Sequence, residues 1–168
     1  MKRIFKNLIF VTLILATLLG AVSCGGEMKK YSENGLSFAL PKDMKKMNVN
    51  YADLCFGNDE LTEVMFYFIS KDSLLTMCSL DKEATVKEYA DWFCGSNGYT
   101  NVEENYDEEN RVIVLKYIYE DEDEHDYYCD YITRNEHAVF HVTMCCKANL
   151  KDKYDPMFDE WMTYIRIN

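Results

Sequence analysis

The residues best suited to chemistry are seven cysteines, three histidines and a surplus of acidic side chains. The catalytic and phosphate-binding motifs G-x-S-x-G, H-E-x-x-H and G-x-x-x-x-G-K are absent from the sequence. His137 and His141 have the spacing of a metal pair only if they lie on a helix. Their surroundings predict a strand, on which four residues span about 13 Å, too far for one ion. We therefore expect no metal ion between these two histidines.

A cysteine beside a histidine is the remaining route to nucleophilic chemistry. Cys145 and Cys146 are adjacent, so on a strand their side chains point to opposite faces and one of them is buried. The strand pairing that we expect places His125 near this end of the sheet. No third orienting group can be named, so we favour a structural role for both cysteines. A thiol enzyme is the alternative.

Acidic residues gather in two predicted turns. The loop 120–126 could hold calcium through carboxylate oxygens, but Asp126 stands where an EF-hand needs glycine and Ile132 where it needs a bidentate glutamate. The second group, expected at the other end of the sheet, comprises Glu103, Glu104, Asp107, Glu108 and Glu109. We interpret both groups as solvated turns, with metal binding by the 120–126 loop as an alternative.

Six cysteines follow Cys24, an even number that would suit disulfides in an exported protein. They are Cys55, Cys78, Cys94, Cys129, Cys145 and Cys146. No two of them have the C-x-x-C spacing of redox and zinc motifs. The sequence does not choose among the possible pairings, and we favour free or partly paired thiols that act as small buried hydrophobic residues.

Hydrophobic patterning predicts the strands that come first in the chain. A turn at 34–35 precedes an alternating strand that stops at Pro41, and a second strand is expected near 49–56. Residues 63–70 are apolar at almost every position, which indicates a strand covered on both faces. Residues 74–80 fit either a short strand or an irregular crossover.

Two helices are predicted. The first begins at Thr85, which forms a capping box with Glu88, and ends at the glycines of 95–98. Its apolar stripe is Val86, Tyr89, Ala90, Phe93 and Cys94. The second has Asp155 as its N-cap and Pro156 at its first position. Its apolar stripe is Met157, Trp161, Tyr164 and Ile165, and we expect this helix to seal one face of the sheet.

Between residues 99 and 147 the hydrophobic period changes to two. Turns at 106–110, 120–126 and 135–136 divide this stretch into four antiparallel strands. If Arg134 pairs with His137, one buried face carries Tyr127, Cys129, Tyr131, Thr133, Ala138, Phe140, Val142 and Met144. The opposite face, too apolar to lie in water, carries Val112, Val114, Ile118, Ile132 and Val139. We therefore predict an α+β fold in which a largely antiparallel sheet of six or seven strands, ending in a four-strand meander, lies between helices.

The N-terminus has the features of an export signal. Three basic residues precede the apolar run 8–22, and the small residues Ala21 and Ser23 lie just before Cys24. This pattern resembles the lipobox of bacterial lipoprotein signal peptides. The resemblance implies cleavage between Ser23 and Cys24 and attachment of lipid to Cys24. An uncleaved anchor would need about 20 apolar residues, whereas this run is shorter and is broken by two threonines and a glycine.

The chain therefore divides into a signal at 1–23, a lipidated cysteine with a short tether at 24–33, and one α+β domain at 34–168. The signal holds three of the 18 basic residues and none of the 29 acidic ones, so 15 basic and 29 acidic residues remain, a formal net charge of −14. Such a charge repels nucleic acid and anionic headgroups, so we expect membrane contact through lipid and no nucleic-acid partner. No cofactor is predicted.

The start of the expected domain, residues 34–41, reads Asn-Gly-Leu-Ser-Phe-Ala-Leu-Pro. This opening and the order of elements over 31–168 resemble PsbP-like domains. The resemblance implies a compact α+β sandwich with a binding or accessory role and no catalysis, since the group includes photosynthetic accessory subunits, nuclear transport factors and bacterial lipoproteins. No site residue carries over from it.

Together these features predict an extracytoplasmic protein with a binding or accessory role. Lipid would anchor it to the cell membrane, or to the outer membrane in a host with two membranes. Another envelope protein is the candidate partner. The alternative is an envelope enzyme or metal-binding protein that uses a thiol or the loop 120–126.

Overall fold

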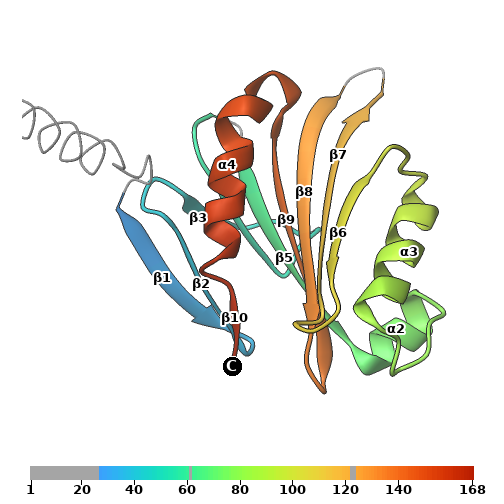
Figure 1. Cartoon of the computed structure of the whole chain (residues 1–168). Coiled ribbons are helices and arrows are strands. Elements are labelled where there is room, and N and C mark those ends of the chain that lie inside the picture. Colours follow the sequence, from blue (N-terminus) through green and yellow to red (C-terminus); the bar gives the residue numbers. More distant parts are fainter. Residues whose placement is uncertain (1–26, 61, 122–123) are drawn as a thin grey trace, which may run out of the picture.

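The computed structural model describes residues 27–60, 62–121 and 124–168. Within these ranges the chain forms two antiparallel sheets and three α-helices (Figure 1). The strands are β1 (Met28–Glu33), β2 (Leu36–Pro41), β3 (Lys45–Met47), β4 (Leu54–Gly57), β5 (Glu63–Ser70), β6 (Glu103–Asp107), β7 (Val112–Glu120), β8 (His125–Arg134), β9 (Ala138–Lys147) and β10 (Arg166–Ile167). The helices are α2 (Lys71–Met77), α3 (Val86–Asn97) and α4 (Lys151–Met162), and a 3-10 turn, η1 (Ala148–Leu150), leads into α4.

The larger sheet has seven strands in the order β3-β4-β5-β9-β8-β7-β6, and each neighbouring pair is antiparallel. Strands β6 to β9 are neighbours in both sequence and space, which confirms the predicted four-strand meander. The smaller sheet has the order β1-β2-β10, because the C-terminal strand pairs with the start of β2.

The larger sheet is the middle of three layers (Figure 1). Helix α4 and the smaller sheet cover one face, which we call the α4 face, and helices α3 and α2 cover the other, the α3 face. Each face has its own buried cluster. The α4 cluster includes Leu36, Phe38, Phe66, Val142, Phe158 and Trp161, and the α3 cluster includes Leu74, Tyr89, Ala90, Ile113 and Ile132. The predicted α+β architecture with helices on both faces is confirmed.

Helix α3 begins as the sequence predicts. The Thr85 hydroxyl accepts a hydrogen bond from the Glu88 backbone N–H at 3.1 Å, and the Glu88 carboxylate accepts one from the Thr85 backbone N–H at 2.7 Å. These two bonds satisfy amides that the start of a helix otherwise leaves unpaired. Gly98 ends the helix with a φ of 69°, in the left-handed region that glycine adopts without strain.

Strands β8 and β9 pair two residues away from the predicted register, since Arg134 lies opposite Val139 and not opposite His137. The turn is longer because the Asn135 side chain accepts hydrogen bonds from the backbone of His137 and Ala138. A shift of two residues leaves every side chain on the same face. The predicted buried face is therefore confirmed, with Tyr127, Cys129, Phe140, Val142 and Met144 in the α4 cluster and Tyr131 and Ala138 packed against it.

The face predicted for β7 is wrong. Pairing with β8 places Ile113 opposite Ile132, so Ile113 and Tyr117 join the α3 cluster. Val114 packs instead against the α4 cluster, and Ile118 is exposed. Because β7 is apolar at both odd and even positions, only its register with β8 decides which side chains face which helix.

Helix α4 begins at Lys151, about one turn before the predicted start at Pro156. Asp155 is not the N-cap, because its carboxylate accepts hydrogen bonds from Lys116 and Tyr127 of the sheet. The earlier start also rotates the buried stripe, which consists of Tyr154, Phe158 and Trp161, whereas Tyr164 is exposed. The prediction that Trp161 lies in the core is confirmed.

Three other segments differ from the sequence-based expectation. Residues 28–33, placed in the tether, form β1 and pair with β2. Residues 71–77 form α2, which Ser70 caps, and the strand expected near 49–56 is confined to β4. The signal and the lipidation site Ser23-Cys24 lie outside the described residues. Among the helices of the described ranges, none is long and apolar enough to cross a membrane.

Candidate functional site

A pocket of about 490 Å³ lies between α3 and the larger sheet, and we call it the aromatic pocket. Seven aromatic rings line it: Tyr67, Tyr117 and Tyr128 from the sheet, Tyr89, Trp92 and Phe93 from α3, and Tyr99 from the loop after α3. The other lining residues are Met65, Ile69, Met77, Cys78, Asn97, His141 and Thr143. A largely apolar cavity of about 300 to 1,000 Å³ with a few polar groups is the usual form of a small-molecule site.

Cross-strand pairing builds the sheet side of the aromatic pocket. Tyr117 of β7 lies directly opposite Tyr128 of β8, and their rings stack with centroids 5.4 Å apart. Side chains opposite one another on adjacent strands lie close enough for their rings to interact, so the register brings Tyr117 and Tyr128 together. Tyr99, from the loop after α3, also stacks on Tyr117, with ring centroids 4.5 Å apart.

Helix α3 builds the opposite wall. Tyr89, Trp92 and Phe93 lie three and four residues apart, so they share one side of the helix. Tyr89 is buried, whereas Trp92 and Phe93 are only half-buried because the space beside them is the pocket. The Phe93 ring meets the His141 ring edge-on at 4.6 Å, which joins the helix wall to the sheet.

A buried polar group forms the floor of the aromatic pocket. His141 Nε2 lies 2.9 Å from Asp130 Oδ1, and His141 Nδ1 lies 3.1 Å from the Tyr89 hydroxyl oxygen. Thr143 Oγ1 donates to the same Asp130 oxygen at 2.5 Å. The two ring nitrogens of His141 therefore link the Asp130 carboxylate to the Tyr89 hydroxyl. The second carboxylate oxygen, Asp130 Oδ2, has no hydrogen-bond partner among the described residues.

Burial raises the pKa of the pocket tyrosines well above the usual value for a phenol. This holds for Tyr67, Tyr89, Tyr117 and Tyr128, and the negative charge of Asp130 is a further cause at the first three. The phenols therefore stay protonated near neutral pH. The walls of the aromatic pocket are uncharged rings above a buried carboxylate.

Tyr89, His141 and Asp130 follow the order hydroxyl, imidazole, carboxylate that is found in catalytic triads. A triad activates its hydroxyl, however, whereas burial here raises the pKa of Tyr89 and stabilises the protonated phenol. Tyr89 is also only 4% exposed. The three side chains can therefore hold one another in place, but they do not make Tyr89 a better nucleophile.

The structure does not bring His125 together with the adjacent cysteines. His125 is exposed at the start of β8, Cys146 is buried in the α4 cluster, and Cys145 points to the α3 face opposite Tyr128. Burial raises the pKa of both thiols, to about 11 for Cys146, so neither is an activated nucleophile. All six cysteines of the described ranges are free thiols.

The candidate metal ligands of the sequence also lie apart. His141 is buried and His137 is exposed. In the part of the chain that the structure describes, no three histidine, cysteine or acidic side chains are grouped as metal ligands. In the loop 120–126, Asp121 accepts a hydrogen bond from the Glu124 backbone, while residues 122 and 123 lie outside the described ranges. The second acidic group begins on β6, which is exposed throughout.

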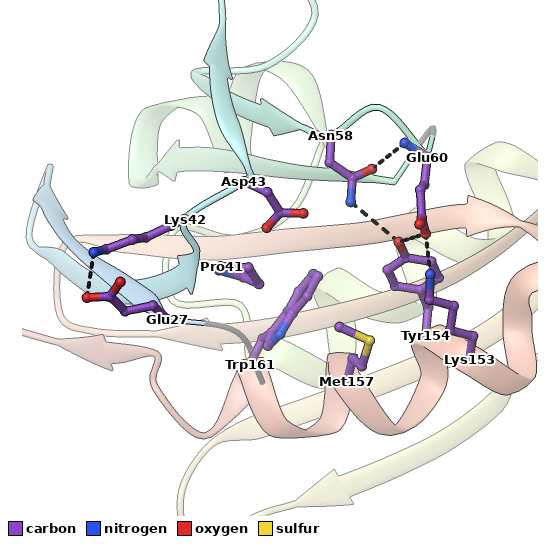
Figure 2. Close-up of a pocket in the computed structure, with 10 residues that line it drawn as sticks. All are labelled: Glu27, Pro41, Lys42, Asp43, Asn58, Glu60, Lys153, Tyr154, Met157 and Trp161. Atoms are coloured by element: carbon purple, nitrogen blue, oxygen red, sulfur yellow. Dashed lines mark hydrogen bonds and ion pairs between the residues drawn. The ribbon is translucent and has the colours of Figure 1, made fainter. Parts of the chain in front are cut away.

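A second hollow, of about 390 Å³, lies beside α4 (Figure 2). Part of its polar rim is paired, since Glu60 accepts a hydrogen bond from Tyr154 at 2.5 Å and forms an ion pair with Lys153. Glu27 and Lys42 form another ion pair at 2.5 Å on the opposite side of the hollow. Trp161 Nε1, which has no hydrogen-bond partner among the described residues, also lines this hollow, but only two aromatic rings do, against seven in the aromatic pocket.

Comparison with known proteins identifies the fold. No protein-family model matches the sequence. No curated protein matches it at a significant level. Among solved structures, cyanobacterial PsbP (CyanoP) from Synechocystis sp. PCC 6803 is similar over 89% of this chain and 99% of its own, with a TM-score of 0.58 and 18% identity. The fold of this chain is PsbP-like.

Two further solved structures are similar at lower scores. A Bacteroides thetaiotaomicron VPI-5482 protein aligns with 83% of this chain and 48% of its own, with a TM-score of 0.49 and 12% identity. A Pseudomonas aeruginosa protein of unknown function aligns with 85% of this chain and 99% of its own, with a TM-score of 0.46 and 11% identity.

Sequence reasoning did not identify the aromatic pocket. Tyr89 and Phe93 were expected only as core residues, and Asp130 was not singled out. One signal was present in the sequence: Asp130 interrupts the otherwise apolar and aromatic run 127–132. A carboxylate at such a position is rarely buried without a partner, so it points to a polar site inside the sheet.

Proposed function

We propose that this protein is a lipid-anchored binding or accessory domain of the cell envelope and that the aromatic pocket is its binding site. The observation that carries the proposal is the unfilled pocket lined by seven aromatic rings on the α3 face. Large apolar walls with few polar groups suit the capture of a ligand or of a partner's side chain. The raised pKa values of Tyr89 and of the thiols argue against nucleophilic catalysis at the same place.

Lipid on Cys24 would set the location of the domain. Strand β1 begins at Met28, four residues after Cys24, so an extended connection would reach no more than about 14 Å. The two or three acyl chains of a mature bacterial lipoprotein would hold the protein on the membrane permanently, whereas a single chain binds only marginally. The acidic chain adds no attraction for anionic headgroups, so the lipid would be the main membrane contact.

The anchor is tested by replacing the proposed lipidation site in the full chain. After metabolic labelling with a fatty acid, we expect label in the wild type and none in Cys24→Ala, which should also retain its signal. Cys94→Ala is the matched control, because it removes a half-buried thiol from α3 and should leave labelling unchanged. Equal label in the wild type and in Cys24→Ala would exclude the lipoprotein assignment.

The binding site is tested with indole, an uncharged aromatic probe, on the full lipoprotein in lipid nanodiscs. Protein-free nanodiscs correct for partitioning into lipid. Saturation-transfer NMR should show saturable binding that Tyr128→Leu weakens at least about fivefold, since one stacked ring is lost. Tyr164→Leu, which removes an exposed tyrosine from the α4 side, is the control and should bind as the wild type does. Equal binding by both variants would place the probe elsewhere.

A further inference from the structure

We infer that the aromatic pocket selects an organic cation, an alkylammonium group, and that the buried carboxylate of Asp130 supplies the selecting charge. The inference rests on the proposed binding role of the aromatic pocket and names the class of its ligand. Three observations carry it: the neutral rings of the walls, the Asp130 oxygen of the floor that has no hydrogen-bond partner, and the absence of lysine and arginine from the lining that the structure describes.

The walls suit a cation because aromatic faces carry negative electrostatic potential. An ammonium group within about 6 Å of a ring centroid is attracted most strongly by tryptophan and then by tyrosine and phenylalanine. Trp92 and Phe93 on α3 and Tyr67 and Tyr128 on the sheet are all half-buried, so part of each ring remains open to the aromatic pocket. Quaternary ammonium groups are recognised by such surrounding rings in other proteins.

The floor adds a negative charge close to the site. Asp130 is 0% exposed, and its register partner Thr143 lines the aromatic pocket, so the carboxylate lies on the pocket side of the sheet. Oδ1 accepts both hydrogen bonds, from Thr143 and His141, while Oδ2 accepts none among the described residues. No lysine or arginine lines the aromatic pocket to offset the Asp130 carboxylate, and burying a carboxylate without a full counter-charge is costly. A cation in the pocket would offset that cost through the low-dielectric interior without touching Asp130.

The lining of the aromatic pocket also argues against an anionic ligand. None of its described residues is a lysine or an arginine. Four other hollows of the molecule each include at least one such residue: Lys42, Lys30, Arg134 and Lys116 are examples. An anionic ligand in the aromatic pocket would meet the Asp130 charge with no lysine or arginine to offset it. The net acidity of the chain further favours cations.

The experiment compares choline with 3,3-dimethylbutan-1-ol, which has the same shape but a carbon in place of the charged nitrogen. Both are titrated by calorimetry into the full lipoprotein in nanodiscs made without choline lipids, and protein-free nanodiscs are subtracted. We expect choline to bind at least about tenfold more tightly than the alcohol. Equal or weaker binding of choline overturns the cation inference. If indole still binds in that case, the proposed binding role stands; if indole also fails, both are wrong.

Asp130→Asn tests the origin of the preference, because asparagine keeps the shape and an acceptor oxygen but removes the charge. We expect choline binding to fall to within about twofold of alcohol binding, with the alcohol unaffected. Asp91→Asn is the matched control, since it removes an exposed carboxylate from α3 that pairs with Lys87. It should keep the choline preference, and an equal loss in both variants would assign the effect to the general field of the protein and overturn the role of Asp130.

A second variant keeps the inference falsifiable if Asp130→Asn fails to fold. Trp92→Leu removes one half-buried ring while leaving an apolar wall. It should weaken choline binding more than it weakens alcohol binding, by about fivefold or more, because only the cation uses the ring potential. Equal weakening of both ligands would show that the ring contributes apolar contact alone, and would overturn selection of a cation by the aromatic walls.

Discussion

The two faces of the larger sheet are both rich in aromatic residues, but they use them differently. On the α4 face, Tyr154, Phe158 and Trp161 are 2%, 0% and 2% exposed, and their rings pack against one another. On the α3 face, Trp92 and Phe93 are half-buried around an open pocket. An aromatic stripe at helical spacing therefore does not by itself distinguish a sealed core from a binding site. The residues that pack opposite the stripe decide whether it forms a sealed core or the wall of a binding site.

The difference follows from what covers each face. The α4 face has two covers, because the smaller sheet packs beside α4 and inserts Leu36, Phe38 and Leu40 into the same cluster. The Phe38 and Phe66 rings lie 4.2 Å apart, which closes the gap between the two sheets. The α3 face has only the short α2 as a second cover, and it contributes Leu74. Stability should therefore reside mainly on the α4 face, and binding on the α3 face.

The largest expected effect belongs to Trp161→Ala on the α4 face. Removing this buried ring loses its apolar contacts and leaves a cavity, so we expect a loss of about 3 to 5 kcal/mol. The total stability of a domain of this size is typically about 5 to 15 kcal/mol, so partial unfolding should follow. Thermal unfolding of the chain from Gly25 onward measures the effect, with Trp161→Phe as a milder control. An unchanged midpoint would remove Trp161 from the core.

A smaller effect, dependent on pH, is expected at Asp155. This carboxylate lies 2.7 Å from Lys116 Nζ and 2.5 Å from the Tyr127 hydroxyl. Burial acts to raise the pKa of Asp155, but the hydrogen bonds from Lys116 and Tyr127 outweigh burial and lower the pKa below its ordinary value. Because the pKa of Asp155 is lowered in the folded state, the ionised carboxylate stabilises the fold at pH values above the ordinary pKa of an aspartate. This contribution is lost as the pH falls through the pKa of the folded state.

We therefore expect Asp155→Asn to cost about 1 to 2 kcal/mol at pH 7, a modest figure because the pair is partly exposed. The cost should shrink at a strongly acidic pH, below the lowered pKa of Asp155 in the folded state, where the wild-type carboxyl is also protonated. Urea unfolding of both proteins at the two pH values measures it. A difference that is the same at both would show that the charge of Asp155 does not hold α4 to the sheet.

On the α3 face, Thr85→Ala should cost about 1 kcal/mol, because it removes the side-chain acceptor for the Glu88 amide. Thr85→Ser keeps a hydroxyl at the same place and should recover most of the loss. Urea unfolding of the three proteins gives the comparison. A serine variant as unstable as the alanine variant would mean that the threonine methyl group, and not the cap, stabilises α3.

Elements with local signals could be predicted from the sequence. The capping box of Thr85 and Glu88 fixes the start of α3, and the apolar run 63–70 matches β5. The four-strand meander follows from its turns and its period of two. Even a register error of two residues left the buried faces of β8 and β9 correct, because side chains alternate with that period.

Features that depend on distant partners could not be predicted. The start of α4 shifts because Asp155 pairs with Lys116, which lies 39 residues earlier in the chain. The face of β7 is decided by its register with β8. The aromatic pocket is harder still to predict from the sequence, because it is a space that the surrounding side chains leave empty. Its walls meet only after α3 docks on the sheet, so no local pattern encodes it.

The smallest effect on stability is expected for Trp92→Leu, and it tests the comparison of the two faces most directly. Trp92 is half-buried at the edge of the aromatic pocket, so leucine should keep most of its packing and cost less than about 1 kcal/mol. The same substitution at Trp161 should cost at least about 2 kcal/mol, since this ring is 2% exposed and packs against the rings of Tyr154 and Phe158.

Each variant keeps one of the two tryptophans of the chain, so fluorescence reports one face at a time. In Trp161→Leu, the emission of Trp92 should respond to a ligand in the aromatic pocket, whereas in Trp92→Leu the emission of Trp161 should not. Urea unfolding gives the two stability losses. If Trp92→Leu costs as much as Trp161→Leu, the rings of α3 are as much a sealed core as those of α4, and the separation of binding from stability between the two faces is wrong.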